Sequence, residues 1–431
     1  ARAINDDFSI EEALPQLAVT LKDERFTSEA LIRRAINANL RVGTEENLNI
    51  LADYASRGSA PAEMRAEAIA ALSTWEKPSV LDRVDGRYRG EVLREDANVM
   101  TTLAPVIGTW IADTETEVQM AAAKAAGKLS IKAAENGLLA LLQEGVGEEA
   151  QVAALESLSA MESGLLSDAL ELGMASRSNA VKSSALAILP ESGIAENKAV
   201  PLFEDILRTG TTANKQAAFT ALGGMKGSEA KKLLGTYLDR LLKGRVAQDI
   251  QLDLLEAAEQ QEDIIFDDKL TTYYASKDPN NSISAYSEAL YGGNPQRGGQ
   301  IFYTNEAAQC VRCHSIFELG GNAGPGLMGV GARLSREKLL ESMVAPSAAY
   351  AAGYEVVNLK LTDGSSTAGY LQSENSQTVK LKVGEKITEI AKADIESRTS
   401  IPSSMPPMGS ILTKRELRDL VATLASLQPE S

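Results

Sequence analysis

The stretch Cys310-Val311-Arg312-Cys313-His314 decides the fold expected for the C-terminal part of this chain. It contains both cysteines and the only histidine among 431 residues. Cys-x-x-Cys-His is the spacing of covalent c-type haem attachment, in which two thiols add to the haem vinyl groups and the adjacent imidazole ligates the iron. We therefore expect one covalent haem c, held by Cys310 and Cys313, with His314 as the proximal ligand.

Two other uses of these residues compete with haem attachment. A reducible dithiol or disulfide of the thioredoxin kind belongs in a βαβ unit, and the surrounding sequence has no such pattern. A structural zinc site needs four ligands, whereas the motif supplies three and the chain has no other cysteine or histidine. Both interpretations are weaker than haem attachment.

Length, composition and charge limit the possible partners. A chain of 431 residues is expected to form two or more domains. Its formal charge of −16 argues against nucleic acid as a partner, because nucleic-acid binding needs a clustered basic surface. The acidic surface either simply keeps the protein soluble or also steers it toward a basic redox partner. No stretch is apolar enough to span a membrane. Because haem is attached outside the cytoplasmic membrane in bacteria, we expect a periplasmic or otherwise extracytoplasmic location.

Residues from about 8 to 290 have the periodicity of successive helices, with apolar residues three and four positions apart and breaks at glycines. A leucine recurs roughly every 30 residues, with one longer interval that contains an insertion from about Glu76 to Asp96. Alanines precede most of these leucines by one helical turn. The leucines are Leu40, Leu72, Leu129, Leu158, Leu189, Leu222 and Leu255, and the alanines are Ala68, Ala125, Ala154, Ala185 and Ala218. This pattern predicts an α-solenoid that resembles HEAT-like repeats, with an irregular helical domain as the alternative.

The composition changes to Gly, Asn, Pro and Arg around Tyr291–Gly299, which predicts a domain boundary. We expect a helical repeat domain over 1–290 and a haem domain over 291–431. Three helices are expected in the haem domain: a short one before Cys310, one near Ser335–Val344, and an amphipathic one over Thr413–Leu427.

Between the last two of these helices, the apolar period drops to two. Residues from about 354 to 400 are therefore expected to form a small β-rich insert that supplies no iron ligand. The expected strands begin at Val357 and then cover Thr367–Gln372, Thr378–Val383 and Lys386–Ala391, with a turn at Asp363-Gly364.

The order of helix, haem motif, Gly-Pro-x-Leu, Met-Pro-Pro and closing helix resembles a class I cytochrome c. Gly324-Pro325-Gly326-Leu327 matches that family's loop after the histidine. The resemblance implies that Pro325 and Leu327 belong to the haem pocket. It also implies that the Pro325 carbonyl accepts a hydrogen bond from the imidazole of His314 and fixes its orientation.

The two terminal helices of the haem domain carry the same resemblance. Gly298 and Phe302 match the family's first helix, and Leu420 and Leu424 match its last. The family often has an aromatic residue where this chain has Thr423. The expected fold class is therefore mainly α: a HEAT-like α-solenoid followed by a class I cytochrome c domain that carries a small β-rich insert.

A narrower resemblance covers nearly the whole chain. Haem-binding proteins of planctomycetes and verrucomicrobia are similar in their HEAT-like repeats, haem motif and late Met-Pro, and also in three short motifs: Ala345-Pro346-Ser347, Gly353-Tyr354-Glu355 and Asp363-Gly364. Members of that family are often joined to a β-propeller that resembles sugar or sorbosone dehydrogenases. The resemblance thus implies a dehydrogenase partner without naming its substrate.

The sixth iron ligand is the main open choice. One histidine excludes bis-histidine coordination within one chain, which leaves a thioether, a lysine, the N-terminal amine or an open position. The family places its axial methionine at Met405, and Met408 is the next candidate, with packing as the alternative role for either. Met328 is expected on the proximal loop and Met343 on a helix face. A His/Met pair raises the reduction potential and suits electron transfer.

Three functions follow from these choices. The leading one is periplasmic electron transfer, as the electron-acceptor part of a dehydrogenase system. The alternatives are a peroxidase-like haem enzyme with an open sixth position, and a solenoid scaffold in which haem is structural. Gly324-x-Gly326-x-x-Gly329 fits a dinucleotide fingerprint formally but lacks the strand that should precede it.

The sequence opens at Ala1 without the pattern of a secretory signal. We expect either that a signal has been removed or that the chain is a piece of a longer protein. The first helices also lack a recognisable polar cap, which is expected if a dehydrogenase module packs against them.

Overall fold

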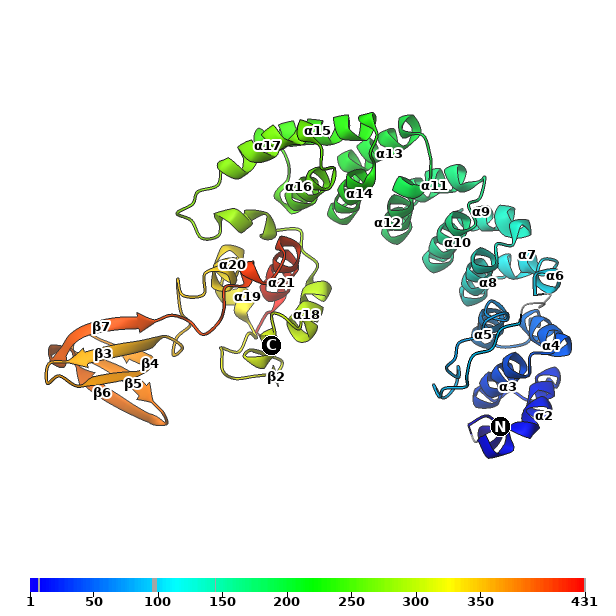
Figure 1. Cartoon of the computed structure of the whole chain (residues 1–431), viewed down its shortest axis with the longest axis horizontal. Helices are drawn as coiled ribbons and strands as arrows, with labels where there is room; N and C mark the ends of the chain where they lie inside the picture. Colours follow the sequence, from blue (N-terminus) through cyan, green and yellow to red (C-terminus); the bar gives the residue numbers. More distant parts are fainter. Residues whose placement is uncertain (7, 95–98, 144, 430–431) are drawn as a thin grey trace. The chain divides into compact units, whose positions relative to one another are not determined.

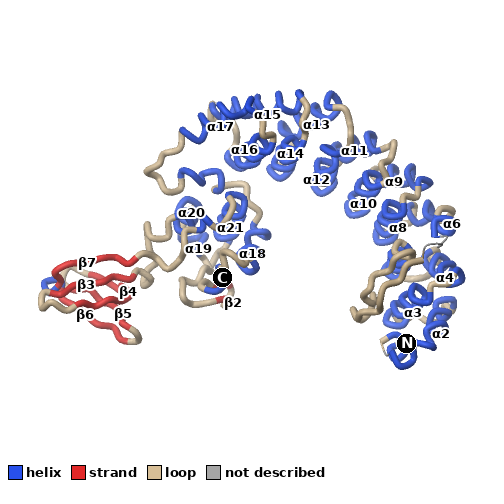
Figure 2. Tube along the Cα trace, in the orientation of Figure 1, coloured by secondary structure: helices blue, strands red, loops and turns tan. Residues whose placement is uncertain are grey.

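The structure, a computed structural model, describes residues 1–6, 8–94, 99–143 and 145–429. The described chain is mainly α-helical and carries a small five-stranded antiparallel sheet (Figure 1, Figure 2). It divides into two compact units, Ala1–Gly210 and Thr211–Ser431. The boundary expected near residue 290 lies inside the second unit, and the division into a repeat domain and a haem domain stays a prediction.

In the first unit, alternate helices pack against one another, so that α3, α5, α8, α10 and α12 form one row. Four alanines of the repeat, Ala68, Ala125, Ala154 and Ala185, lie along this row and are fully buried, which lets neighbouring helices approach closely. The α-helices of this unit are α1 (Arg2–Asn5), α2 (Leu14–Val19), α3 (Glu29–Val42), α4 (Glu45–Ala55), α5 (Ala62–Leu72), α6 (Val99–Leu103), α7 (Ile107–Ile111), α8 (Thr116–Leu129), α9 (Glu135–Leu141), α10 (Glu148–Ala160), α11 (Leu166–Ala175), α12 (Asn179–Ile188) and α13 (Glu196–Thr209).

The insertion expected from Glu76 to Asp96 is described as far as Arg94, and its last two residues lie outside the described ranges. It is an irregular loop pinned by one buried carboxylate. Asp82 accepts hydrogen bonds from the amide of Asn37 on α3, at 2.9 Å, and from the guanidinium of Arg89, at 3.0 Å. The loop is thereby tied to the row of helices.

The second unit begins with four more helices, in which α14 packs on α16 and α15 packs on α17. They are α14 (Thr212–Gly224), α15 (Ser228–Leu242), α16 (Gln251–Gln260) and α17 (Ile264–Ala275). Leu222 and Leu255, which continue the leucine series, are buried on α14 and α16. A short 3₁₀ segment, η6 (Ser284–Ala289), leads to the region of the haem motif.

The helices of that region have clear local causes. Asn294, Ser335 and Thr413 each accept a hydrogen bond from a backbone N–H in the first turn, and Thr413 forms a capping box with Glu416. The α-helices are α18 (Pro295–Thr304), α19 (Val330–Arg333), α20 (Arg336–Val344) and α21 (Lys414–Ser426), with short 3₁₀ turns η7 (Cys310–Arg312) and η9 (Met408–Ser410).

Helices α18 and α21 meet at Gly298. A Cβ atom there would lie 2.1 Å from the carbonyl oxygen of Asp419, so no larger residue fits without displacement of one helix. Thr423, at the position where the resembled family often has an aromatic residue, donates a hydrogen bond of 2.7 Å to the carbonyl of Pro295. The hydroxyl thus makes a polar contact between the two helices where an aromatic ring would make an apolar one.

The sheet has the strand order β6-β5-β4-β3-β7, with every neighbouring pair antiparallel. Its strands are β3 (Val356–Leu361), β4 (Ser366–Glu374), β5 (Thr378–Val383), β6 (Lys386–Ala391) and β7 (Ile395–Ile401). One face buries a separate small core of Val357, Leu359, Val379, Leu381 and Ile390. The segments that enter and leave the sheet lie side by side, because Tyr350 donates to the Ile401 carbonyl and the Ser403 N–H donates to the Ser347 hydroxyl.

A buried ion-pair network fastens α21 to α16. The Arg418 guanidinium lies 2.6 Å from the Asp253 carboxylate, and both side chains are almost completely buried. Arg415 also pairs with Asp253, at 3.0 Å. Loss of one partner from a buried ion pair costs about 3–5 kcal/mol of folding free energy. These contacts therefore help to hold α21 against α16 within the second compact unit.

Candidate functional site

The haem motif forms one tight turn of backbone. Cys310 opens η7, and its carbonyl accepts hydrogen bonds from the N–H groups of Cys313, at 3.2 Å, and His314, at 2.9 Å. Both cysteines are free; Cys310 is half-buried and Cys313 is exposed. Burial raises the pKa of the Cys310 thiol, whereas redox-active dithiols depend on a lowered pKa. This environment does not activate Cys310 as a redox-active thiolate.

The imidazole of His314 is held by the carbonyl of Pro325, which lies 2.9 Å from Nδ1. A carbonyl oxygen can only accept, so Nδ1 carries the proton, and in the neutral imidazole Nε2 then has the free lone pair. This is the contact that the resemblance implies, and it is the arrangement typical of a metal-ligating histidine, whose second nitrogen is fixed by a backbone carbonyl.

The loop after the motif lies against it through three backbone hydrogen bonds of 2.8–2.9 Å. The N–H groups of Gly321, Gly324 and Leu327 donate to the carbonyls of Val311, Cys313 and Ser315, respectively. This ladder holds the loop parallel to the residues on both sides of His314.

Gly324 lies directly against the imidazole. A Cβ atom at this position would be 2.6 Å from Cε1 of His314, so a side chain here would push the ring out of place. The formal dinucleotide fingerprint therefore has another physical explanation. Its glycines follow a strand of two residues, β2 (Leu319–Gly320), and precede the four-residue helix α19, which together form no βαβ unit.

The four methionines of this region occupy different environments. Met408 is 4% exposed, inside the core formed by α18, α20 and α21, and Met343 is buried on α20. Met328 and Met405 are half-buried at the edge of that core. Met408 thus lies within the core, whereas Met405 is the more exposed of these two candidate ligands.

Three of the predicted site residues border one apolar cluster. Cys310, Leu327 and Met405 all pack against the core that contains Phe302 and Met408. Two free thiols, an imidazole with Nε2 available and a half-buried thioether are the donor set that a covalently attached His/Met haem requires. In the part of the chain that the structure describes, no group of three or more His, Cys, Asp or Glu side chains is placed to hold a metal ion.

Sequence reasoning missed one contact of the site. The hydroxyl of Tyr354, just before β3, donates a hydrogen bond of 3.1 Å to the carbonyl of Gly324. Tyr354 stands in the short motif Gly353-Tyr354-Glu355, and that motif was the only available signal. Nothing in the spacing indicates that it reaches back by 30 residues to the loop beside His314.

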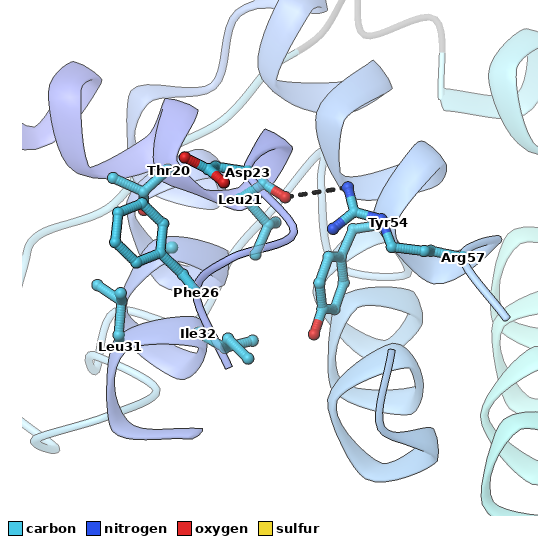
Figure 3. A pocket seen from close by; sticks show the side chains of 9 residues that line it. Thr20, Leu21, Asp23, Phe26, Leu31, Ile32, Tyr54 and Arg57 are labelled. Atoms are coloured by element: carbon cyan, nitrogen blue, oxygen red, sulfur yellow. Dashed lines mark hydrogen bonds between the residues drawn. The ribbon is translucent and has the colours of Figure 1, made fainter. Parts of the chain in front are cut away.

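A small pocket in the first unit has a different character (Figure 3). Arg57 donates a hydrogen bond of 3.1 Å to the Leu21 carbonyl beside it, and Tyr54 is buried with its hydroxyl unpaired among the described residues. The lining includes neither thiol nor imidazole and so offers no ligand set for haem. It consists of Thr20, Leu21, Asp23, Phe26, Leu31, Ile32, Ala35, Tyr54 and Arg57.

Comparisons with known proteins identify no family. No protein-family model matches the chain, and no curated protein matches it. Among solved structures, human deoxyhypusine hydroxylase in complex with glycerol is similar over 65% of this chain and 94% of that chain, with 15% identity and a TM-score of 0.27. A similarity this distant carries no argument about fold or function. Among the described helices, none has the length and apolar character needed to cross a membrane.

Proposed function

We propose that this chain is a c-type cytochrome that transfers electrons through one covalently bound His/Met haem. The observation that carries the proposal is the only histidine of the chain, placed directly after Cys-x-x-Cys and held at Nδ1 by the Pro325 carbonyl. Such a histidine presents Nε2 as an axial ligand in a fixed orientation.

In this proposal, Cys310 and Cys313 form the two thioether links, His314 is the proximal ligand and Met405 is the distal ligand. Bound haem supplies an iron that cycles between the ferric and ferrous states. The chain's residues orient the ligands: Pro325 holds the imidazole proton, and Leu327 adds apolar surface beside the motif. Met405 is preferred to Met408 because the latter is buried in the core.

The proposal extends to the architecture. The pairing of alternate helices supports a HEAT-like α-solenoid over residues 1–290. The caps, the Gly298 contact and the Pro325 hydrogen bond support a class I cytochrome c domain over 291–431, interrupted by the sheet. Together these features support membership of the planctomycete and verrucomicrobial haem-binding proteins.

Haem attachment is tested first by mass. Chain produced together with a bacterial haem-attachment system should gain the mass of one haem and keep its colour after denaturation. Acid extraction with organic solvent should remove none of this haem. Complete extraction would show that the thiols form no thioether links, and the proposal would fail.

Spectra of the oxidised and reduced protein separate electron transfer from the two alternatives. A six-coordinate, low-spin iron that is slow to bind cyanide or carbon monoxide is expected for a His/Met pair. High-spin iron with rapid ligand binding would favour the peroxidase-like enzyme. A low-spin haem that exchanges no electrons with redox mediators would favour the structural role in a scaffold.

The proposed partner is a dehydrogenase, such as a β-propeller module, in the periplasm or another extracytoplasmic compartment. The formal charge of −16 supports a basic docking surface on that partner. Rapid mixing with a reduced candidate dehydrogenase should reduce the haem at a rate that falls as salt increases, since screening weakens electrostatic steering. Reduction by a sugar or an alcohol without a partner would instead identify the chain as the enzyme.

A further inference from the structure

We propose that Tyr354 is a positioning residue for the proximal histidine, His314, and that the sheet holds Tyr354 in place. Its hydroxyl donates a hydrogen bond of 3.1 Å to the carbonyl of Gly324. The predicted effect of Tyr354 on the reduction potential rests on the function proposed above, because it requires bound haem. Its effect on the His314 imidazole can be measured without haem.

The carbonyl that accepts the Tyr354 hydrogen bond belongs to Gly324, which lies directly against the imidazole of His314. Gly324 packs against the ring of His314 with no room for a Cβ atom. The next residue, Pro325, supplies the carbonyl that accepts the Nδ1–H of the same ring, at 2.9 Å. A hydroxyl that fixes Gly324 therefore fixes both the face contact and the hydrogen bond of the imidazole.

Tyr354 is itself held from the side of the sheet. Its N–H donates to the Ala351 carbonyl in a turn, at 3.0 Å, and Gly353 has the positive φ of +82° that this turn requires. The adjacent Glu355 accepts hydrogen bonds from Arg398 and Ser400 on β7, at 3.1 and 2.7 Å. The sheet thus fixes the backbone that presents the Tyr354 hydroxyl to the proximal loop.

The expected effect follows from the imidazole hydrogen bond. A strong Nδ1–H···O=C bond makes the imidazole a better electron donor, which stabilises ferric iron and lowers the reduction potential. Without the Tyr354 hydroxyl the loop is less constrained and this bond is weaker. The reduction potential should therefore rise, although no iron ligand has been changed.

The test compares Tyr354→Phe with Tyr350→Phe in the full chain. Tyr350 provides a matched control because it lies on the same entering segment and also donates to a backbone carbonyl, that of Ile401, at 3.1 Å. The chain has one histidine, so selective ¹⁵N-histidine labelling gives the Nδ1 and Nε2 signals of a single imidazole. In Tyr354→Phe, the Nδ1 proton should exchange with solvent about threefold to tenfold faster, the factor that corresponds to one ordinary hydrogen bond. Tyr350→Phe should match the unmodified protein.

Two results would overturn the proposal: equal proton exchange in both variants, or a reduction potential for Tyr354→Phe that equals that of Tyr350→Phe. If mass shows that no haem is attached, the function proposed above fails, but the exchange measurement on the haem-free chain still decides the role of Tyr354. Similar unfolding midpoints of the two variants would separate a positioning effect from general destabilisation.

Discussion

The two sides of the proposed haem site are built in different ways. On the proximal side, three backbone hydrogen bonds and the Pro325 carbonyl fix a short loop against the imidazole. On the distal side, Met405 lies in the irregular segment between β7 and η9, where its N–H bonds to the Ser403 hydroxyl at 3.2 Å. Backbone contacts thus organise the proposed proximal ligand, His314, whereas the proposed distal ligand, Met405, depends on the packing of its neighbours.

This difference predicts different consequences for the same kind of substitution. Changes on the proximal side should alter attachment and ligand orientation. Changes on the distal side should separate into those that affect iron coordination and those that affect the stability of the core.

The largest effect is expected from removal of both attachment thiols. Cys310→Ala together with Cys313→Ala should abolish covalent haem entirely, because no other thiol is present in the chain. Mass spectrometry of denatured protein measures this directly. Met405→Ala is the matched control and should retain one covalent haem, since attachment belongs to the proximal side. Covalent haem in the double cysteine variant would remove the basis for the comparison.

Substitution of Met408 should mainly affect stability, whereas substitution of Met405 should mainly affect iron coordination. Met408→Ala should lower the free energy of unfolding by about 2–5 kcal/mol, the usual cost of truncating a buried methionine, and should keep the weak far-red sulfur-to-iron absorption. Met405→Ala should abolish that absorption and lower the reduction potential, because the thioether stabilises ferrous iron. Denaturant unfolding and redox titration measure the two properties. The reverse pattern would identify Met408 as the ligand.

A smaller effect is expected from crowding of the proximal loop. Gly324→Ala places a Cβ atom 2.6 Å from the imidazole, and overpacking of this kind costs about 1–3 kcal/mol. The Nδ1 proton of His314 should also exchange faster. Gly326→Ala is the control, since its Cβ atom would come no closer than 3.6 Å to the Ser315 hydroxyl. Equal behaviour of the two variants would show that the close contact with the imidazole has no energetic weight.

The smallest effect concerns the buried carboxylate of Glu288, which pairs with Lys414 on α21. Burial raises the pKa of Glu288, but hydrogen bonds from Lys277 and Tyr273 and the charge of Lys414 outweigh it, so the net pKa is lower than usual. A lowered folded-state pKa contributes stability that is present above the unfolded-state pKa and is lost as pH falls through the folded-state pKa.

Glu288→Gln should therefore destabilise the protein at neutral pH, and its deficit relative to the unmodified chain should shrink as pH falls below about 4.5. Urea unfolding over that pH range measures the deficit. A deficit that stays constant with pH would show that the Glu288 charge makes no net contribution.

Sequence predicted the local features of the region around the Cys-x-x-Cys-His motif well. Each helix expected there is present, because Asn294, Ser335 and Thr413 act as helix caps whose effect depends on neighbours within one turn. Strands β5 and β6 have the expected bounds, since alternating apolar residues face the small core of the sheet.

Features that depend on distant contacts were not predicted. Strand β7 is almost entirely exposed and polar, and it is a strand because it pairs with β3. The joining of α21 to α16 through Arg418 and Asp253 likewise has no local signal, because the two residues lie 165 positions apart. The Tyr354 contact belongs to the same class. Haem attachment, the distal ligand and the family stay predictions.

The paired segments at the base of the sheet have a consequence for chain entropy. If Val356–Ile401 were a flexible loop, closing it to bring the methionine segment back to the haem motif would cost conformational entropy. This cost rises by about 0.6 kcal/mol for each doubling of the loop length. Because the Tyr350–Ile401 and Ser347–Ser403 hydrogen bonds bring the two ends together, the folded sheet acts as a short link. Its hairpins can therefore change in length among related proteins with little effect on the return of Met405.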